Sequence, residues 1–275
     1  MLNISSWKDS FNPNEYEYTE NYSNNKPDYI CIGVMKGGTT SLIHYLNYHP
    51  EIFMADPEVH FFDKTTIDGS SRSRKEIINY ENRFSETNKP IKGEKTPSYC
   101  YLKHAMDNIY NYDKNMKLII LLREPISRAY ANYNHASQVG NTWTLSSKTD
   151  NQMLDDFKSD KIKGLKGGTF ILKGYYDEIL DYILSKFPRQ NLYIGISEEI
   201  NENKLKYYNE IYEFLGASRL DKINENLNTH IRQYGKPIPK SLEKYLYNIY
   251  KPHNERLYKI LGRRIEKWEE YYKQI

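Results

Sequence analysis

The glycine-rich residues 33–41 have the composition of a loop that binds phosphate. An apolar run ends in this turn, and an amphipathic segment starts directly after it. Small residues at such a turn let backbone N–H groups approach an anion at a helix N-terminus. Gly33 and Gly38 have the spacing of the glycines in a nucleoside triphosphatase loop, but Thr39 occupies the lysine position and Lys36 lies inside the loop. The sequence therefore predicts an anion cradle without the Mg²⁺–triphosphate apparatus. An ordinary strand–turn–helix connection is the alternative.

A second candidate anion site follows the nearly continuous apolar run at 116–122. Arg123 comes directly after this run, where a triphosphatase would have an acidic Mg²⁺ ligand. Doubly wound folds bind ligands at the carboxyl edge of the sheet, and a planar guanidinium suits a bidentate phosphate contact. A surface salt bridge with Glu124 is the alternative. Two anion sites without a metal ligand predict a ligand that has two phosphate-like groups, and no bound metal.

Two further segments carry candidate acid–base groups. In an extended segment over 57–63, Glu58 and His60 project to the same side. A carboxylate beside an imidazole, flanked by aromatic side chains that restrict water, can act as a general base with a helper. A solvated carboxylate at the edge of an element is the alternative. Lys95 ends a predicted short strand, where it can attract an anionic group or lie in solvent.

The bulk composition bounds the partners and the compartment. Lys and Arg number 39 against 36 Asp and Glu, and a net charge of +3 is too balanced for a nucleic-acid binder that depends on bulk charge. Two cysteines do not make a disulfide framework, and Cys31 reads as a buried thiol. Residues 1–26 are polar, and no apolar run is long enough to span a bilayer. We therefore expect a cytoplasmic protein that has no transmembrane segment and does not bind nucleic acid.

Strands and helices alternate along the chain, which is typical of a three-layer α/β domain with a central parallel sheet. We expect a polar N-terminal lead-in over 1–28 and a single domain over 29–275, with a surface insertion at the polar residues 139–168. The patterns predict strands at 29–34, 52–54, 91–95, 116–122 and 191–196. They predict helices at 39–48, 75–84, 101–110, after Pro125, and at 169–187, 204–215 and 242–261.

Together the four segments resemble the sulfotransferases that use 3′-phosphoadenosine-5′-phosphosulfate (PAPS), closest to the heparan-sulfate type and its bacterial relatives. The resemblance covers residues 29–268 and continues through Leu172–Tyr175, Phe214–Gly216 and Tyr250–Tyr258. It implies a P-loop-like fold and transfer of a sulfuryl group from PAPS to a hydroxyl or amine. The family's usual acceptor is a carbohydrate, although no residue here identifies the acceptor.

The resemblance also assigns roles to residues. It implies that Glu58 is the catalytic base, that Lys36 neutralises the leaving phosphate oxygen, and that His60 and Lys95 support the transfer, with Asp63 beside them. It implies that backbone N–H groups of Gly37–Ser41 hold the 5′-phosphosulfate and that Arg123 holds the 3′-phosphate. The implied cofactor-binding residues are Lys36, Gly37, Gly38, Thr39, Thr40, Ser41, Arg123, Arg232, Tyr234, Gly235 and Lys236.

Two departures from the family pattern accompany this assignment. Ala131 replaces the serine that usually contributes a hydroxyl to the 3′-phosphate, so Asn132 or Ser127 would have to supply it. The late cofactor loop has its basic residues and glycine in altered order over 232–237. Two other functions stay open, a P-loop kinase of small molecules that needs ATP and Mg²⁺, and a non-catalytic relative that binds sulfated or nucleotide ligands.

Overall fold

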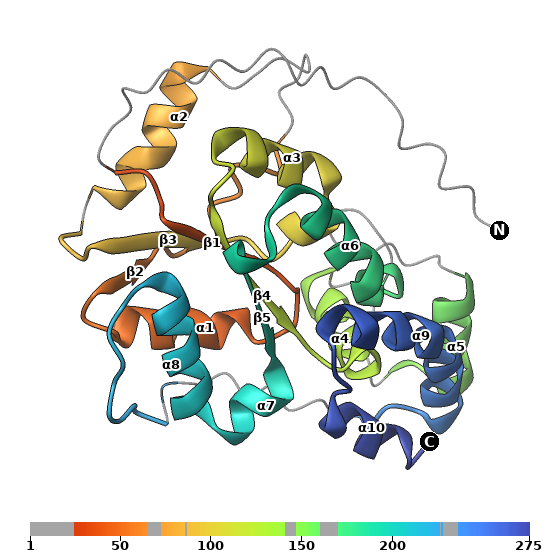
Figure 1. Ribbon diagram of the computed structural model, residues 1–275. Helices are drawn as coiled ribbons and strands as arrows, with labels where there is room; N and C mark the ends of the chain where they lie inside the picture. Colours follow the sequence, from red (N-terminus) through yellow and green to blue (C-terminus); the bar gives the residue numbers. More distant parts are fainter. Residues whose placement is uncertain are drawn as a thin grey trace.

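The computed structural model describes residues 25–64, 73–85, 87–140, 147–159, 170–225, 227 and 236–275. Five parallel strands form one sheet in the order β2-β3-β1-β4-β5 (Figure 1). The strands are β1 (Tyr29–Gly33), β2 (Ile52–Met54), β3 (Ile91–Lys95), β4 (Lys117–Leu122) and β5 (Leu192–Ile196). The predicted α/β class with a central parallel sheet is thus confirmed. Most of the expected lead-in over 1–28 lies outside the described residues.

Helices cover both faces of the sheet. The longer ones are α1 (Thr39–Tyr48), α2 (Arg74–Glu81), α3 (Lys103–Tyr112), α4 (Pro125–Gly140), α5 (Asp150–Ser159), α6 (Tyr176–Lys186), α8 (Lys204–Leu215) and α9 (Lys240–Leu261). Two short helices, α7 (Ser197–Glu202) and α10 (Glu266–Tyr272), and the 3₁₀ turns η2 (Asn82–Phe84), η3 (Tyr99–Tyr101), η5 (Leu172–Gly174) and η6 (Arg189–Asn191) complete the described elements. Helices α3 and α6 lie on one side of the sheet, and α1 and α8 lie on the other (Figure 1).

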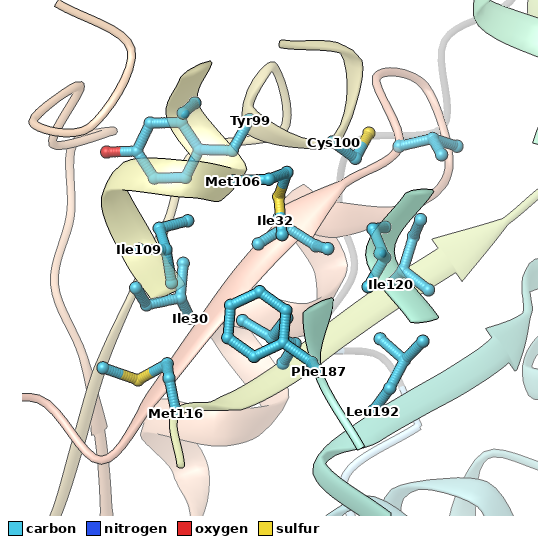
Figure 2. Packing of buried hydrophobic residues seen from close by; sticks show 14 of the residues in the cluster. Ile30, Ile32, Tyr99, Cys100, Met106, Ile109, Met116, Ile120, Phe187 and Leu192 are labelled. Carbon is cyan, nitrogen blue, oxygen red and sulfur yellow. The ribbon is translucent and has the colours of Figure 1, made fainter. Parts of the chain in front are cut away.

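The two faces of the sheet follow the alternation of side chains along its central strands. Ile30 and Ile32 of β1 face α3 and α6, whereas Tyr29 and Cys31 face α1 and α8. Because both faces are covered, β1 and β4 are apolar at nearly every position, whereas β3 carries Lys92, Glu94 and Lys95. Figure 2 shows the first face, where side chains of β1 and β4 pack against Met106 and other residues of α3. Burial of each such aliphatic side chain contributes roughly 1.5–3 kcal/mol.

A third apolar cluster packs α4, α5 and α9 together beside the sheet. The expected surface insertion at 139–168 is therefore wrong in part, because helix α5 lies within it and buries Met153 and Phe157. These two apolar residues have the spacing of one helix face. The sequence analysis did not assign a helix here, because Asp155 and Asp156 make the segment polar on average. The expected helix over 169–187 is shorter in the structure, since a 3₁₀ turn precedes α6.

The two cysteines, Cys31 and Cys100, are both free and buried, and burial raises the pKa of the Cys31 thiol to about 12. The expectation of a buried thiol at Cys31 is confirmed. Among the described helices, none combines the length and the apolar character needed to cross a membrane.

Gly93 sets the closest approach between β3 and β1. A Cβ atom at this position would lie 2.5 Å from the Tyr29 carbonyl oxygen and 2.5 Å from its ring. We expect Gly93→Ala to lower the free energy of unfolding by about 1–3 kcal/mol, because the added methyl forces the two strands apart. Urea denaturation measures this change. Lys92→Ala, next to it on the strand, should cost less than about 0.5 kcal/mol, and an equal loss in both variants would contradict the close-packing argument.

Candidate active site

The predicted site residues of the four segments that follow β1, β2, β3 and β4 lie at the carboxyl edge of the sheet. Because all five strands are parallel, the segments after β1, β2, β3 and β4 leave the sheet on the same side. The chain from β1 runs outward to β2, whereas β4 lies on the other side of β1. This reversal is the switch point where open α/β sheets bind ligands. Main-chain bonds tie these ends together, from Val34 N to the Leu121 carbonyl (3.1 Å) and from Thr96 N to the Cys31 carbonyl (3.0 Å).

The loop after β1 has the geometry of an anion-binding nest. Lys36 and Gly38 both have positive φ, 67° and 91°, and helix α1 begins directly afterward. Among the described residues no side chain caps α1, so the first amides of this helix have no intrahelical acceptor and face the loop. The amide of Gly37 differs, because it donates to the Val34 carbonyl at 2.9 Å. In this structure the Gly37 amide therefore bonds a backbone acceptor, and its role in anion binding stays a prediction.

Arg123 lies against this loop. Its Nη1 donates to the Lys36 carbonyl at 3.3 Å, and its own carbonyl accepts a bond from the Tyr176 hydroxyl at 2.7 Å. The next residue, Glu124, is buried and bonds the amides of Ile126 and Ser127 at the start of α4. The structure thus brings together the two predicted anion-binding groups, one from the end of β1 and one from the end of β4.

The candidate acid–base groups form one cluster. His60 Nε2 lies 3.2 Å from Glu58 Oε2, and Lys95 Nζ lies 3.5 Å from Glu58 Oε1. On its other side, His60 Nδ1 lies 2.6 Å from Asp63 Oδ2. The Glu58 side chain keeps 41% of its surface exposed, whereas that of Lys95 keeps 6%. Glu58 is thus open to an incoming molecule while its two partners hold it from the protein side.

A fully buried carboxylate lies beneath this cluster. Glu94 precedes Lys95 on β3 and accepts hydrogen bonds from the hydroxyls of Tyr80 (3.0 Å), Tyr99 (3.2 Å) and Thr96 (2.9 Å). Burial raises the pKa of Glu94 to about 7, which the three hydroxyls only partly offset. The sequence analysis missed this residue, because a glutamate beside a strand lysine does not reveal its burial.

Sequence reasoning also missed two buried cations behind the loop. Lys173 is 1% exposed, its Nζ lies 3.7 Å from Met35 Sδ, and its ammonium lies 5.5 Å from the centre of the Tyr101 ring. The Tyr101 hydroxyl in turn accepts a bond from the Met35 amide. Desolvation, with the neighbouring Arg128 guanidinium, lowers the pKa of Lys173 to about 8. Arg128 is itself fully buried and donates to the Phe170 carbonyl. Both cations add positive potential on the protein side of the loop.

The late cofactor loop is described only at its end. Arg232, Tyr234 and Gly235 lie outside the described residues. Lys236 is described, and its ammonium contacts Asp150 Oδ1 at 2.8 Å and the Lys148 carbonyl at 3.1 Å. The role of these four residues in cofactor binding stays a prediction. Ala131, which departs from the family serine, is 2% exposed on α4, and its neighbour Asn132 is 3% exposed.

One group of side chains in the described part of the chain has the composition of a metal site. Asp177, Glu178 and His253 bring ligand atoms within 4.8 Å of one another. However, Asp177 Oδ2 accepts a 2.6 Å bond from Arg256 Nε, and His253 Nδ1 lies 2.8 Å from Asp177 Oδ1. The buried carboxylate is thus already paired with a guanidinium, and the group is best described as an ion-pair cluster that joins α6 to α9.

Known proteins resemble this chain in sequence and in fold. Human heparan sulfate glucosamine 3-O-sulfotransferase 3B1 is 30% identical over 220 residues, which cover 77% of this chain and 52% of that protein. The mouse 3B1 protein is 27% identical and is covered over 64% of its length. The chain thus spans about half to two thirds of the length of these curated relatives. A sulfotransferase of Alicyclobacillus acidocaldarius superimposes with a TM-score of 0.70 at 20% identity, covering 89% of this chain and 99% of that one, and supports the fold.

A sequence profile of the sulfotransferase domain family matches residues 26–244. This range includes the loop at Lys36, the Glu58 cluster and Arg123, so the match and the assembled edge of the sheet concern the same residues. The resemblance predicted from the four short segments is confirmed, and the chain belongs to the sulfotransferase domain family.

Proposed function

We propose that this protein transfers a sulfuryl group from PAPS to a hydroxyl or amine of a carbohydrate acceptor. The observation that carries the proposal is the meeting of an exposed carboxylate, held by His60 and Lys95, with two anion-binding groups at one edge of the sheet. The names of the heparan sulfate 3-O-sulfotransferases support a glycan acceptor, since these relatives act on a glucosamine unit.

The residues at the edge fit a donor that carries phosphate at two places. The first turn of α1 and Lys36 would hold the 5′-phosphosulfate, and Arg123 would hold the 3′-phosphate. When bound, PAPS supplies the sulfuryl group and a phosphate oxygen that leaves. The buried charges of Lys173 and Arg128 support an anionic occupant of the loop, because they raise the local potential without contacting solvent.

Different residues of the chain then have different roles in the transfer. Glu58 accepts the proton of the acceptor O–H or N–H as the acceptor atom bonds to sulfur. Lys36 neutralises the negative charge that develops on the leaving phosphate oxygen, and fixed charges of this kind usually supply the largest share of the rate. His60, bonded to Asp63, holds the base in place, and Lys95 balances its charge.

Two other functions predict different requirements. A small-molecule kinase would need ATP and Mg²⁺, and a binding protein would hold ligand without turnover. Incubation with labelled PAPS and a panel of glycan acceptors, in parallel with ATP and Mg²⁺, separates the three. Label moved only from PAPS supports the proposal, whereas label moved from ATP, or no transfer to any acceptor, contradicts it.

The base is tested by Glu58→Gln. We expect sulfuryl transfer to fall by about 10²–10⁴-fold, the usual contribution of a positioned general base. The dissociation constant of 3′-phosphoadenosine-5′-phosphate (PAP), measured by calorimetry, should stay unchanged because Glu58 contacts the acceptor. Glu213→Gln, an exposed carboxylate that pairs with Arg219, is the matched control. Full activity in Glu58→Gln would contradict the assignment of the base.

Arg123 is tested with two ligands that differ by one phosphate. We expect Arg123→Ala to weaken PAP binding by roughly 10–100-fold, the worth of a charge-assisted hydrogen bond of about 1.5–3 kcal/mol. Binding of adenosine 5′-phosphate, which lacks the 3′-phosphate, should change far less. Arg219→Ala, an exposed arginine, serves as control. An equal loss for both ligands would place Arg123 at the 5′ group instead.

Lys173 predicts a pH dependence of stability. Its pKa is about 8 in the folded chain against 10.5 in the unfolded chain, so the unfolded state binds more protons between these values. Stability relative to Lys173→Met should therefore rise as pH increases from about 8 to about 10, because the neutral amine is less costly to bury. Urea unfolding at several pH values measures the difference. Lys251→Met, on the surface of α9, should show no such trend; a flat difference for Lys173→Met would contradict the argument.

A further inference from the structure

The buried carboxylate of Glu94 is the centre of a hydrogen-bond network beneath the Glu58 cluster. Its side chain is 0% exposed, and its two oxygens accept three hydroxyl donors, from Tyr80 of α2, Tyr99 of η3 and Thr96, the residue after β3. Among the residues that the structure describes, no lysine, arginine or histidine forms an ion pair with Glu94. A buried charge without a counterion requires several hydrogen-bond donors, and here all three are hydroxyls.

Two of these hydroxyls also accept hydrogen bonds from the main chain of the segment that carries the candidate base. Thr96 Oγ1 accepts the His60 amide at 3.2 Å. The Tyr99 hydroxyl accepts the amides of Phe61 at 2.8 Å and Phe62 at 3.1 Å. A hydroxyl has one proton and two lone pairs. Because each proton points to Glu94, the lone pairs are left for three consecutive amides of the segment.

The segment needs this restraint because its backbone is strained. His60 has a φ of 51°, in the left-handed region that residues other than glycine rarely adopt. Such conformations persist only where surrounding contacts fix them. In this conformation the imidazole reaches Glu58 on one side and Asp63 on the other. The hydrogen bonds donated by the backbone amides of residues 60–62 therefore hold the geometry of the candidate base.

We propose that Glu94 is a positioning residue, which acts through Thr96 and Tyr99 to hold His60 against Glu58. This inference rests on the proposed function, in which Glu58 is the base. Glutamine at position 94 would keep one acceptor oxygen, but its amide group would donate toward Thr96 and compete with the His60 amide for the hydroxyl lone pairs. The ordinary alternative is that Glu94 only satisfies hydroxyl groups of the core.

Glu81 provides a matched control for that alternative. It is also buried, at 1% exposure, and it accepts a 2.7 Å bond from the Tyr112 hydroxyl of α3. Glu81→Gln therefore perturbs a buried carboxylate–tyrosine pair on the same side of the sheet. Its donor Tyr112 packs edge-on against the Phe62 ring at 5.4 Å, whereas the amides of residues 60–62 bond Thr96 and Tyr99. The two variants are compared at urea concentrations that give them equal free energies of unfolding. This comparison separates a positioning role of Glu94 from a general loosening of the core.

The test combines amide hydrogen exchange with kinetics at pH 8, where Glu94 is mostly ionised. We expect Glu94→Gln to speed exchange of the 60–62 amides roughly tenfold or more, since each of these buried amides would lose part of its hydrogen bonding. Thr96→Val should speed only the His60 amide, Tyr99→Phe only those of Phe61 and Phe62, and Thr96→Ser should restore protection. The kcat of Glu94→Gln should fall roughly tenfold or more, while its KM for PAPS and its PAP affinity stay unchanged.

Equal exchange rates and equal kcat in Glu94→Gln and Glu81→Gln would overturn the positioning role. A fall in PAP affinity of Glu94→Gln without faster exchange would also overturn it, since the network would then act on the donor site. Failure of the wild-type protein to transfer a sulfuryl group would instead contradict the proposed function. In that case the exchange rates still decide whether Glu94 holds the 60–62 segment.

Discussion

Parallel pairing of five strands is the constraint on which the rest of this structure depends. Parallel strands end at the same edge, so groups from four segments that are far apart in the sequence come close together there. The central strand β1 has covered faces and neighbours on both sides, which fixes its register to β3 and β4. The loop at Lys36 therefore starts from a rigid base, and Arg123 at the end of β4 lies within hydrogen-bond reach of it.

The edge also concentrates positive charge in a partly buried setting. Arg123 bonds the loop at the Lys36 carbonyl, while Lys173 and Arg128 lie behind the loop, away from solvent. Burial of a cation is unfavourable, as the lowered pKa of Lys173 shows. The same burial lets the charge act through a medium of low dielectric constant, where its attraction for a phosphate is stronger than in water.

The sequence predicted the fold and the outer layer of the site, which contains Lys36, Glu58 and Arg123. It did not predict the layer beneath, which contains Glu94, Thr96 and Tyr99. Strands β1 and β4 are apolar runs, so the charged residues after them were placed correctly at one edge. Glu94, Thr96 and Tyr99 look like ordinary residues in the sequence, because their roles depend on contacts with Tyr80 and with the 60–62 segment, which pack in three dimensions. Helices α5 and α10 were missed for a similar reason, since each buries only one or two apolar side chains between polar ones.

The two layers differ because binding and proton transfer make different demands on geometry. Coulomb attraction between a cation and a phosphate falls slowly with distance, so in their proposed roles Lys36 and Arg123 would tolerate small displacements. A general base must lie within about 2.6–3.2 Å of the atom whose proton it removes, and Glu58, the proposed base, lies on a loop rather than on a strand. Such a loop needs restraint from the protein side. The hydroxyls of Thr96 and Tyr99, held by Glu94, provide it by accepting hydrogen bonds from three backbone amides of the strained turn at His60.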